Sequence, residues 1–401
     1  MKLDKYTAIL GNTIGYPDME GLTDRRPLAS LPFDAKYRLI DFQLSSLANA
    51  GIHSIYGLFQ RDNTSSIFDH VRSGREWGLD SLLSHWYLGF YNTKYNDHTT
   101  DRAYYEQLLT FLKRSGSDRT VYMGCDMLCN IDIRQVIRLA ERAQSPMTVV
   151  YKRVPASMVT PANEVLEVSA DDEVIGKGTL PEYRAGLAGV DISPDSSTGL
   201  AHEFADPDEL ISMSADIYVL ETNWLIAQME EEVKNEHPRK LRFLLRSLLE
   251  EHRALAFGYT GYLANITSVK SYFDANMDML EPEHFYSLLY SNQKVYTKVK
   301  NEESTYFSPE CEIEDSQFAS GSIIKGRVKK SIISRSCHVD EDSFVCHSIA
   351  FSKVHVGAGA RVEYAVLDKN VVIQPGVTVK GTPEKPIVIT KGSIVEEDII
   401  R

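Results

Sequence analysis

The first 280 residues alternate short apolar runs with stretches of helical periodicity, and this alternation disappears after residue 316. Between residues 40 and 50 the apolar positions recur at helical spacing, and Gly51 follows, so we expect a helix that ends there. Strands that alternate with helices are typical of βαβ units and a mostly parallel sheet. The expected strands cover residues 6–10, 52–58, 120–123, 147–151, 216–220 and 254–259, and the other expected helices cover residues 66–71, 102–115, 133–144, 224–231 and 240–250.

Two stretches depart from this alternation. Residues 156–214 are rich in glycine, proline and acidic positions, which predicts an antiparallel excursion or a covering loop. Residues 281–310 read as a helical tail followed by an extended linker. We therefore predict three parts: an α/β domain over residues 1–280, the tail and linker over residues 281–310, and a second domain over residues 311–401.

The second domain carries an apolar residue at every fifth or sixth position, between small and polar residues. This spacing indicates a hexapeptide repeat, in which each turn of a parallel β-helix points one apolar side chain inward. An ordinary β-sandwich is the alternative, although its turns would recur every 8–12 residues. The open end and flat sides of a β-helix also favour oligomerisation. The expected inward positions are Val328, Ile333, Val339, Val345, Phe351, Val356, Val362, Leu367, Ile373 and Val379.

Charge and composition narrow the range of partners and compartments. The 401 residues carry a formal net charge of -13, which argues against nucleic acid or an anionic membrane as the main partner. Neither a signal peptide nor an apolar run of 18 residues is evident, so we expect a cytoplasmic protein. Cys125 and Cys129 have no neighbouring His or Cys pair in the sequence, which favours packing thiols over a metal site.

The stretch over residues 32–52 begins P-F-D-A-K-Y-R-L-I-D-F-Q-L-S-S. It resembles the signature P-F-G-G-K-Y-R-x-I-D-F-x-L-S-N of bacterial glucose-1-phosphate adenylyltransferases, also called ADP-glucose pyrophosphorylases. The resemblance implies a Rossmann-like nucleotidyltransferase domain followed by a left-handed β-helix. It also implies the family's reaction, in which ATP and glucose 1-phosphate give ADP-glucose and pyrophosphate with Mg²⁺ as cofactor.

Several positions that match the family's motifs carry a different residue. The first loop of the family has paired glycines and an arginine, whereas this chain has Gly11 and Asn12 and no arginine. Leu28 stands where the resemblance implies a triphosphate-binding lysine, and removal of such a cation slows catalysis strongly. The sugar-phosphate motif E-K-P is missing from the first domain, while the glutamine of the family's T-Q-Y motif is kept as Gln60.

The metal-binding positions are also altered. Asp126 matches the first Mg²⁺ carboxylate of the family, but Asn265 replaces the second. Since Mg²⁺ prefers charged oxygen, we expect only a vestigial metal site and no catalytic residues that work. The pattern is similar to that of a regulatory second subunit in bacterial glycogen synthesis. Such a subunit needs no cofactor of its own, and it would form a heterotetramer with a catalytic homologue that holds the Mg²⁺.

Other functions remain open at this point. The chain could be a weakly active adenylyltransferase, or a sensor of sugar phosphates or nucleotides on the same scaffold. His338, His347 and His355 could suggest acyltransferase chemistry, which the sequence does not favour without a basic groove for an acyl carrier. Basic residues of both domains could bind a phosphate-bearing effector or simply be solvated. The effector candidates are Arg25, Arg26, Lys36, Arg38, Arg327 and Arg335.

Overall fold

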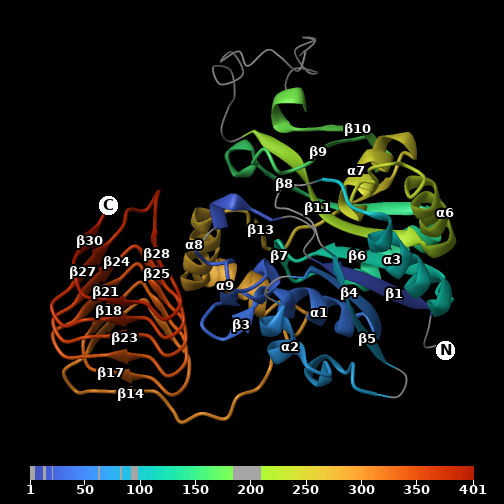
Figure 1. Ribbon diagram of the computed structural model, residues 1–401. Coiled ribbons are helices and arrows are strands. Elements are labelled where there is room, and N and C mark those ends of the chain that lie inside the picture. Colours follow the sequence, from blue (N-terminus) through green and yellow to red (C-terminus); the bar gives the residue numbers. More distant parts are fainter. Residues whose placement is uncertain are drawn as a thin grey trace.

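The computed structural model describes residues 5–11, 15–19, 21–61, 64–81, 84–91, 98–183 and 209–401 (Figure 1). An α/β domain and a β-helix lie side by side. The structure confirms an α/β domain with a mostly parallel sheet followed by a left-handed parallel β-helix. None of the helices within these described ranges is long and apolar enough to cross a membrane.

The main sheet has the strand order β10-β9-β11-β6-β1-β4-β5, and β8 and β12 extend it beside β11. The centre is parallel, whereas β11 runs antiparallel to both β6 and β8. The bounds are β1 (Tyr6–Gly11), β4 (Ser54–Gln60), β5 (His85–Tyr91), β6 (Arg119–Gly124), β8 (Met147–Pro155), β9 (Val165–Val168), β10 (Val174–Gly178), β11 (Leu210–Glu221) and β12 (Leu255–Gly258). The excursion predicted over residues 156–214 includes the antiparallel pair β9 and β10, and residues 184–208 lie outside the described ranges.

Helices cover both faces of this sheet (Figure 1). Helices α1 and α4 pack on one face, while α3, α6 and α7 pack on the other. Their bounds are α1 (Leu39–Asn49), α2 (Ser65–Val71), α3 (Arg102–Ser115), α4 (Ile133–Arg142), α6 (Thr222–Glu232), α7 (Leu241–Glu251), α8 (Val269–Met277) and α9 (Pro282–Leu289).

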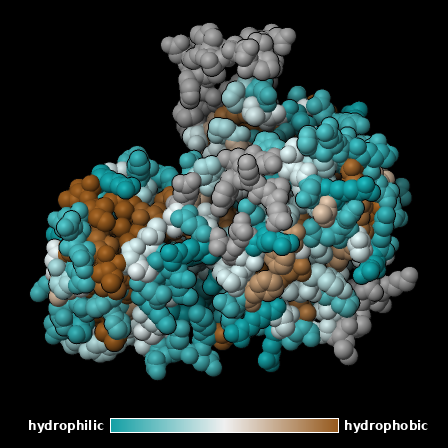
Figure 2. All heavy atoms as spheres, viewed as in Figure 1, coloured by the Kyte–Doolittle hydropathy of each residue, from teal (hydrophilic) through white to brown (hydrophobic). Residues whose placement is uncertain are grey.

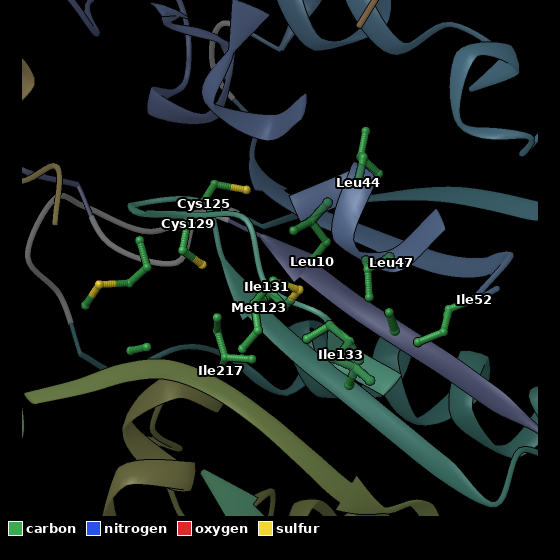
Figure 3. Close-up of a cluster of buried hydrophobic side chains, with 14 of the residues drawn as sticks. Leu10, Leu44, Leu47, Ile52, Met123, Cys125, Cys129, Ile131, Ile133 and Ile217 are labelled. Carbon is green, nitrogen blue, oxygen red and sulfur yellow. The ribbon is translucent and has the colours of Figure 1, made fainter. Parts of the chain in front are cut away.

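The cluster under α1 contains Cys125 and Cys129 (Figure 3). Both thiols are buried among apolar side chains such as Leu44 and Met123. Burial raises the pKa of both thiols, to about 12 for Cys129. No group of three or more possible metal ligands occurs in the described ranges. The two cysteines therefore contribute to packing.

The β-helix consists of three parallel sheets in which each strand pairs with the strand one coil further on. This pairing excludes the β-sandwich alternative, because sandwiches are built from antiparallel hairpins. The strands are β14 (Tyr306–Phe307), β15 (Glu312–Glu314), β16 (Gln317–Phe318), β17 (Ile323–Ile324), β18 (Arg327–Lys329), β19 (Ile332–Ile333), β20 (His338–Val339), β21 (Phe344–Cys346), β22 (Ile349–Ala350), β23 (His355–Val356), β24 (Arg361–Glu363), β25 (Ala365–Leu367), β26 (Val372–Ile373), β27 (Thr378–Lys380), β28 (Ile387–Ile389), β29 (Ile394–Val395) and β30 (Ile399–Ile400).

Nine of the ten predicted inward residues lie in the β-helix core, and Phe351 is the exception. Phe351 instead packs outside the coil with Leu28 and Tyr272 of the first domain. Strand β14 also falls inside residues 281–310, so the first coil begins within the stretch predicted as tail and linker. Its start is fixed by pairing with β17 and by an edge-to-face contact between the rings of Phe307 and Phe318.

One side of the β-helix, which we call the docked face, carries strands β16, β19, β22, β25 and β28. Ile349 and Val366 point outward from this face and join the cluster that contains Leu28 and Phe351. An ion pair beside this cluster joins Arg26 to Asp368, in which Nη2 of Arg26 donates to both carboxylate oxygens over 2.8 and 2.7 Å. The two domains therefore share a continuous core as well as a buried charge pair.

Candidate functional site

Asp126 follows β6 at the carboxyl edge of the parallel strands, where ligands of open α/β sheets bind. Its side chain is buried, and both of its oxygens accept hydrogen bonds. Arg242 on α7 donates to the two oxygens, with a distance of 2.6 Å to Oδ2, and the Tyr16 hydroxyl donates to the same Oδ2 over 2.6 Å. The carboxylate thus has a cationic partner within the chain.

This ion pair is part of a larger buried network. Arg242 Nε lies 3.8 Å from Asp216, and Asp216 also accepts a 2.9 Å bond from Arg246 Nε. Burial alone would raise the pKa of Asp126 and Asp216, but the neighbouring guanidinium groups hold both below the ordinary value. Burial likewise opposes the charge of Arg242, yet the two carboxylates raise its pKa well above normal. All three groups stay charged because each has opposite charge beside it.

Asn265 lies next to Asp126, as the resemblance to the family implied. It ends β13 (Leu263–Asn265), which pairs antiparallel with β7 (Met127–Cys129), and the following residue, Ile266, donates its N–H to the Asp126 carbonyl over 2.8 Å. Asn265 Oδ1 is buried and has no hydrogen-bond partner within the described ranges. A neutral amide beside a carboxylate that already binds Arg242 does not fit Mg²⁺, which prefers charged oxygen ligands.

The other predicted positions of the nucleotide site contribute no cation. Leu28 is buried in the core between the two domains. Gly11 ends β1 and allows close approach, because a Cβ at this position would lie 2.4 Å from the Leu58 carbonyl oxygen. Gln60 ends β4 at the same edge of the sheet, and Asn12 lies outside the described residues. Gly11 is therefore explained by sheet packing.

A second candidate site lies between the domains, and we call it the interdomain pocket. Its cavity measures about 160 Å³. Among the described residues that line it, nine are lysine or arginine and one, Asp69, is acidic. The basic residues are Arg25, Arg26, Lys36, Arg38, Lys298, Lys300, Arg335, Lys369 and Lys391. Such an excess of positive charge in a chain of net charge -13 is suited to a polyanion.

The cations of this pocket destabilise one another. Burial lowers the pKa of Lys300 and Lys369, and nearby cations, Arg335 beside Lys300 and Lys300 beside Lys369, lower it further. Burial also lowers the pKa of Arg38. Lys36, Lys300 and Lys369 form no ion pair with any residue in the described ranges. A bound anion would relieve this repulsion, which is the physical basis for considering the pocket a ligand site.

Five of the six effector candidates line the interdomain pocket, and Arg327 does not. Arg327 lies on β18, where its guanidinium carbon is 5.1 Å from the centroid of the Phe344 ring on the outer surface of the β-helix. Arg26 lines the pocket but is already bonded to Asp368. Sequence reasoning missed Lys298, Lys300, Lys369 and Lys391, although the alternating Lys-Val-Lys of residues 298–300 was a usable signal.

Asp34 lies in the turn that joins the β2 (Pro32–Phe33) and β3 (Tyr37–Arg38) strands beside the pocket. Asp34 and Ala35 replace the two glycines of the family signature and adopt φ values of 48° and 55°, which strain side chains other than glycine. Asp34 is 6% exposed, and its Oδ1 finds no partner among the residues described. Burial raises the pKa of this carboxyl to about 7.

Comparison with known proteins identifies the class of each domain. The first domain matches the nucleotidyl transferase family over residues 19–168, and the second matches the GlmU-like C-terminal hexapeptide family over residues 299–395. The molecule is thus built from a nucleotidyltransferase domain and a hexapeptide-repeat domain.

The chain is 23% identical to the glycogen biosynthesis protein GlgD of Bacillus subtilis over 396 residues, which covers 97% of this chain and 96% of that protein. It is 25% identical to the glucose-1-phosphate adenylyltransferase of Photobacterium profundum, covering 91% of this chain and 90% of the relative. The corresponding enzyme of Bacillus cereus is 24% identical, with 92% of each chain covered. The resemblance to glucose-1-phosphate adenylyltransferases is confirmed for nearly the whole length of the chain.

Proposed function

We propose that this chain is a regulatory, catalytically impaired subunit of a glucose-1-phosphate adenylyltransferase that supplies ADP-glucose for glycogen biosynthesis. Two observations support the proposal. The relatives include both a glycogen biosynthesis protein and glucose-1-phosphate adenylyltransferases. The chain also has the family's scaffold, while the carboxylate expected to hold Mg²⁺ is bonded to Arg242.

The chemistry of adenylyl transfer explains why the ion pair between Asp126 and Arg242 supports catalytic impairment. Phosphoryl chemistry requires cations that stabilise charge on the reacting phosphates, and carboxylates that hold Mg²⁺ in place. Arg242 is buried, so it neutralises Asp126 without being available to a substrate. Leu28 and Asn265 remove further charge from the same path. A site without these charges is expected to catalyse the reaction poorly.

A subunit without chemistry of its own can still act through contact. An allosteric coupling of about 1–3 kcal/mol changes the affinity of a partner roughly 5–150-fold. We propose that the partner is a catalytic homologue, which would supply the Mg²⁺ site in a heterotetramer. Influence on that partner requires that the assembled and separate chains differ in how they bind substrate or effector.

The interdomain pocket is our candidate effector site. It combines residues of the first domain with Arg335, Lys369 and Lys391 of the β-helix. An anion that contacts groups of both domains would bind most tightly when the domains have one particular relative orientation, because only then can it reach both sets of groups. We propose a ligand with one or more phosphate groups, such as a sugar phosphate or a nucleotide, since a cluster of nine basic residues favours multiple negative charges.

The decisive experiment measures ADP-glucose formation by the purified chain, by its catalytic homologue, and by the two mixed, with size-exclusion chromatography of the same samples. We expect negligible activity of the chain alone, a hetero-oligomer in the mixture, and an altered rate or effector response. Turnover by the chain alone at about 1 per second or faster would contradict the impaired site.

A sensor that works without the catalytic homologue is the second candidate, and the excess of positive charge in the interdomain pocket favours it. Two separate peaks and unchanged kinetics in the mixture, together with phosphate-dependent stabilisation of the chain alone, would support the sensor and overturn the subunit proposal. If the chain binds no phosphate compound under any condition, the interdomain pocket is neither the effector site of a regulatory subunit nor the binding site of a sensor.

A further inference from the structure

The α/β domain has a trough that is separate from the region of Asp126 and from the interdomain pocket. Hydrophilic residues cover most of the visible face of this domain in Figure 2, but the trough gathers aromatic rings, and we call it the aromatic trough. It lies between α3 and the starts of β1, β4 and β5, on the sheet face that α3 covers (Figure 1). Its cavity measures about 610 Å³, a size that suits a small-molecule ligand. Asp126 lies at the opposite edge of the sheet, and no described residue lines both this cavity and the interdomain pocket.

Four aromatic side chains form a continuous row along the aromatic trough. His85 and Tyr87 point to the same face of the edge strand β5, and their ring centroids lie 5.7 Å apart. Tyr87 is 46% exposed. Phe111 of α3 continues the row, because its ring lies 5.6 Å from that of Tyr87 and 5.1 Å from that of Tyr56 on β4. Two exposed rings are therefore packed against two buried ones, and the row is longer than a single sugar ring.

Hydrogen bonds hold the buried end of the aromatic trough in place. The Tyr56 hydroxyl donates to Gln107 Oε1 over 2.8 Å, and Gln107 Nε2 donates to the Phe90 carbonyl over 3.2 Å. Gly89 makes room for this pair, because a Cβ at that position would lie 2.2 Å from the Tyr56 hydroxyl oxygen and 2.3 Å from Gln107 Oε1. The trough is therefore preorganised, which lowers the entropic cost of binding a ligand.

Few charges line the aromatic trough, in contrast to the interdomain pocket. Its described lining includes one carboxylate, Glu106, and one guanidinium group, Arg114. Glu106 pairs with Arg102 over 3.0 Å, whereas Arg114 forms no ion pair within the described ranges. Ser54 and Thr110 add hydroxyl groups to the lining. The trough thus offers aromatic surface, hydroxyls and one set of free N–H donors, without the excess of charge that would select a polyanion.

We propose that the aromatic trough binds an α-linked glucan, whose sugar rings stack on His85 and Tyr87 and whose hydroxyls accept hydrogen bonds from Arg114. A glucose ring has C–H groups on its faces and hydroxyls on its rim, and the negative faces of aromatic rings attract such C–H groups. The length of the row favours an oligosaccharide over a single sugar. The choice of an α-glucan rests on the proposed function, because glycogen is the polymer that ADP-glucose would supply. Binding would hold the subunit at the polymer that its assembly helps to extend.

Isothermal titration calorimetry of the full chain with maltopentaose tests the site without the catalytic homologue. We expect a dissociation constant on the order of 0.1–1 mM, because an open trough removes only part of the ligand's surface from water. Binding should be equally tight at low and at high ionic strength, since the ligand is uncharged. Cellopentaose, a β-linked oligosaccharide of the same length, is the control for the linkage, and it should bind much less tightly.

Substitutions at two exposed positions of the trough test the proposed contacts. Y87A should weaken the binding of maltopentaose about tenfold, because it removes the ring on which a sugar stacks. R114Q should weaken it about threefold, since only some of the N–H donors are lost. Y286A is the matched control for Y87A, because Tyr286 is 62% exposed on α9, outside the trough, and its loss should leave the affinity unchanged. R335Q, in the interdomain pocket, should also leave the affinity for maltopentaose unchanged.

Three results would overturn the proposal: no detectable binding of maltopentaose, equal binding of the two oligosaccharides, or unchanged affinity in both Y87A and R114Q. Binding of adenosine that Y87A weakens, without binding of maltopentaose, would instead assign the trough to a nucleoside. Thermal unfolding of each variant shows whether it is folded. A chain that forms the hetero-oligomer but binds no glucan would refute this inference alone, whereas glucan binding by a chain that forms no hetero-oligomer would refute only the proposed subunit.

Discussion

The Asp126 network and the interdomain pocket are two highly charged regions inside the molecule, and their charges are arranged in opposite ways. Around Asp126 each buried carboxylate has a guanidinium group beside it, so the region is electrically complete without a ligand. The interdomain pocket is lined by nine basic residues and one carboxylate, and Arg26 and Arg335 pair with Asp368 and Glu302 beside it, which leaves an excess of positive charge. Similar residue types thus produce a closed structural core in one place and a candidate binding site in the other.

The difference teaches that the presence of a family's site residue does not establish its role. Asp126 is retained, but both of its carboxylate oxygens already accept hydrogen bonds from Arg242. The interdomain pocket, in contrast, is recognised by a shortage of partners, because burial and mutual repulsion both lower the pKa of Lys300 and Lys369. Whether a site residue has a partner of opposite charge within the chain therefore says more about its role than its match to the family motif does.

The strongest test removes the cation from the closed region. R242M should reduce the free energy of unfolding by about 3–5 kcal/mol, because it leaves Asp126 and Asp216 buried without a full set of partners. R134M is the matched control, since Arg134 pairs with Asp132 at the surface and its loss should cost less than about 1 kcal/mol. Urea denaturation of both variants gives the two values, and equal stabilities would contradict a closed, interdependent network.

A second test uses Asp34, a buried carboxyl that lacks the guanidinium partner of Asp126. Its pKa rises from 3.8 in the unfolded chain to about 7 in the folded protein, so the folded state retains the proton between these values. The contribution of this carboxyl to stability should therefore be greatest below about pH 4 and decline as pH rises to about 7. D34N should remove this decline and stabilise the protein at pH 8 by on the order of 2–4 kcal/mol. Thermal unfolding from pH 5 to pH 8 measures it, and parallel curves for both proteins would refute the assignment.

A third test asks whether the open region binds anions. R335Q should weaken binding of inorganic pyrophosphate about tenfold, or ~1.4 kcal/mol, because one cation of the pocket is lost. R327Q should leave binding unchanged, since Arg327 contacts Phe344 outside the pocket. Isothermal titration calorimetry compares the affinity of the two variants for pyrophosphate. The titration is carried out at low ionic strength, because salt then screens the charges least. Equal losses would point to general attraction by surface charge rather than to a pocket.

The smallest expected effect is that of Mg²⁺. A ligand that binds the folded state raises its melting temperature, and we expect no rise with Mg²⁺ relative to EDTA in the absence of nucleotide. N265D should behave in the same way, because Asp126 remains bonded to Arg242 in that variant. A clear stabilisation of the unmodified chain by Mg²⁺ would show that Arg242 yields its position to a metal ion.

Secondary structure that follows from a local pattern of residues could be predicted from the sequence. Helix α3 spans residues 102–115 as its periodicity indicated, and the hexapeptide spacing identified the β-helix. Phe351 was predicted to point inward because its spacing in the sequence fits the inward series. Its side chain instead lies outside the coil, where it packs with Leu28 and Tyr272 of the first domain. Arg327 does not line the interdomain pocket, because it lies on strand β18, whereas Arg335 lies in the turn between β19 and β20.

The pairing at Asp126 could not be predicted from the sequence. Nothing in the stretch L-R-F-L-L-R of α7 distinguishes a buried guanidinium from a solvated one, and its partner lies 116 residues away. Four of the nine basic residues of the interdomain pocket were missed for the same reason, because they come together only when the β-helix docks. Local patterns therefore predicted the scaffold, while the electrostatic character of both sites depends on tertiary contacts.

The Arg26–Asp368 ion pair constrains the order in which the protein matures. It joins residues 342 positions apart, so it can form only after almost the whole chain has been synthesised. Contacts between such distant positions form slowly, and multidomain chains fold from the amino terminus as they emerge from the ribosome. The segment that carries Arg26 and Leu28 must therefore wait for the β-helix, and until then a nascent first domain exposes the apolar surface that later contacts Phe351 and Val366.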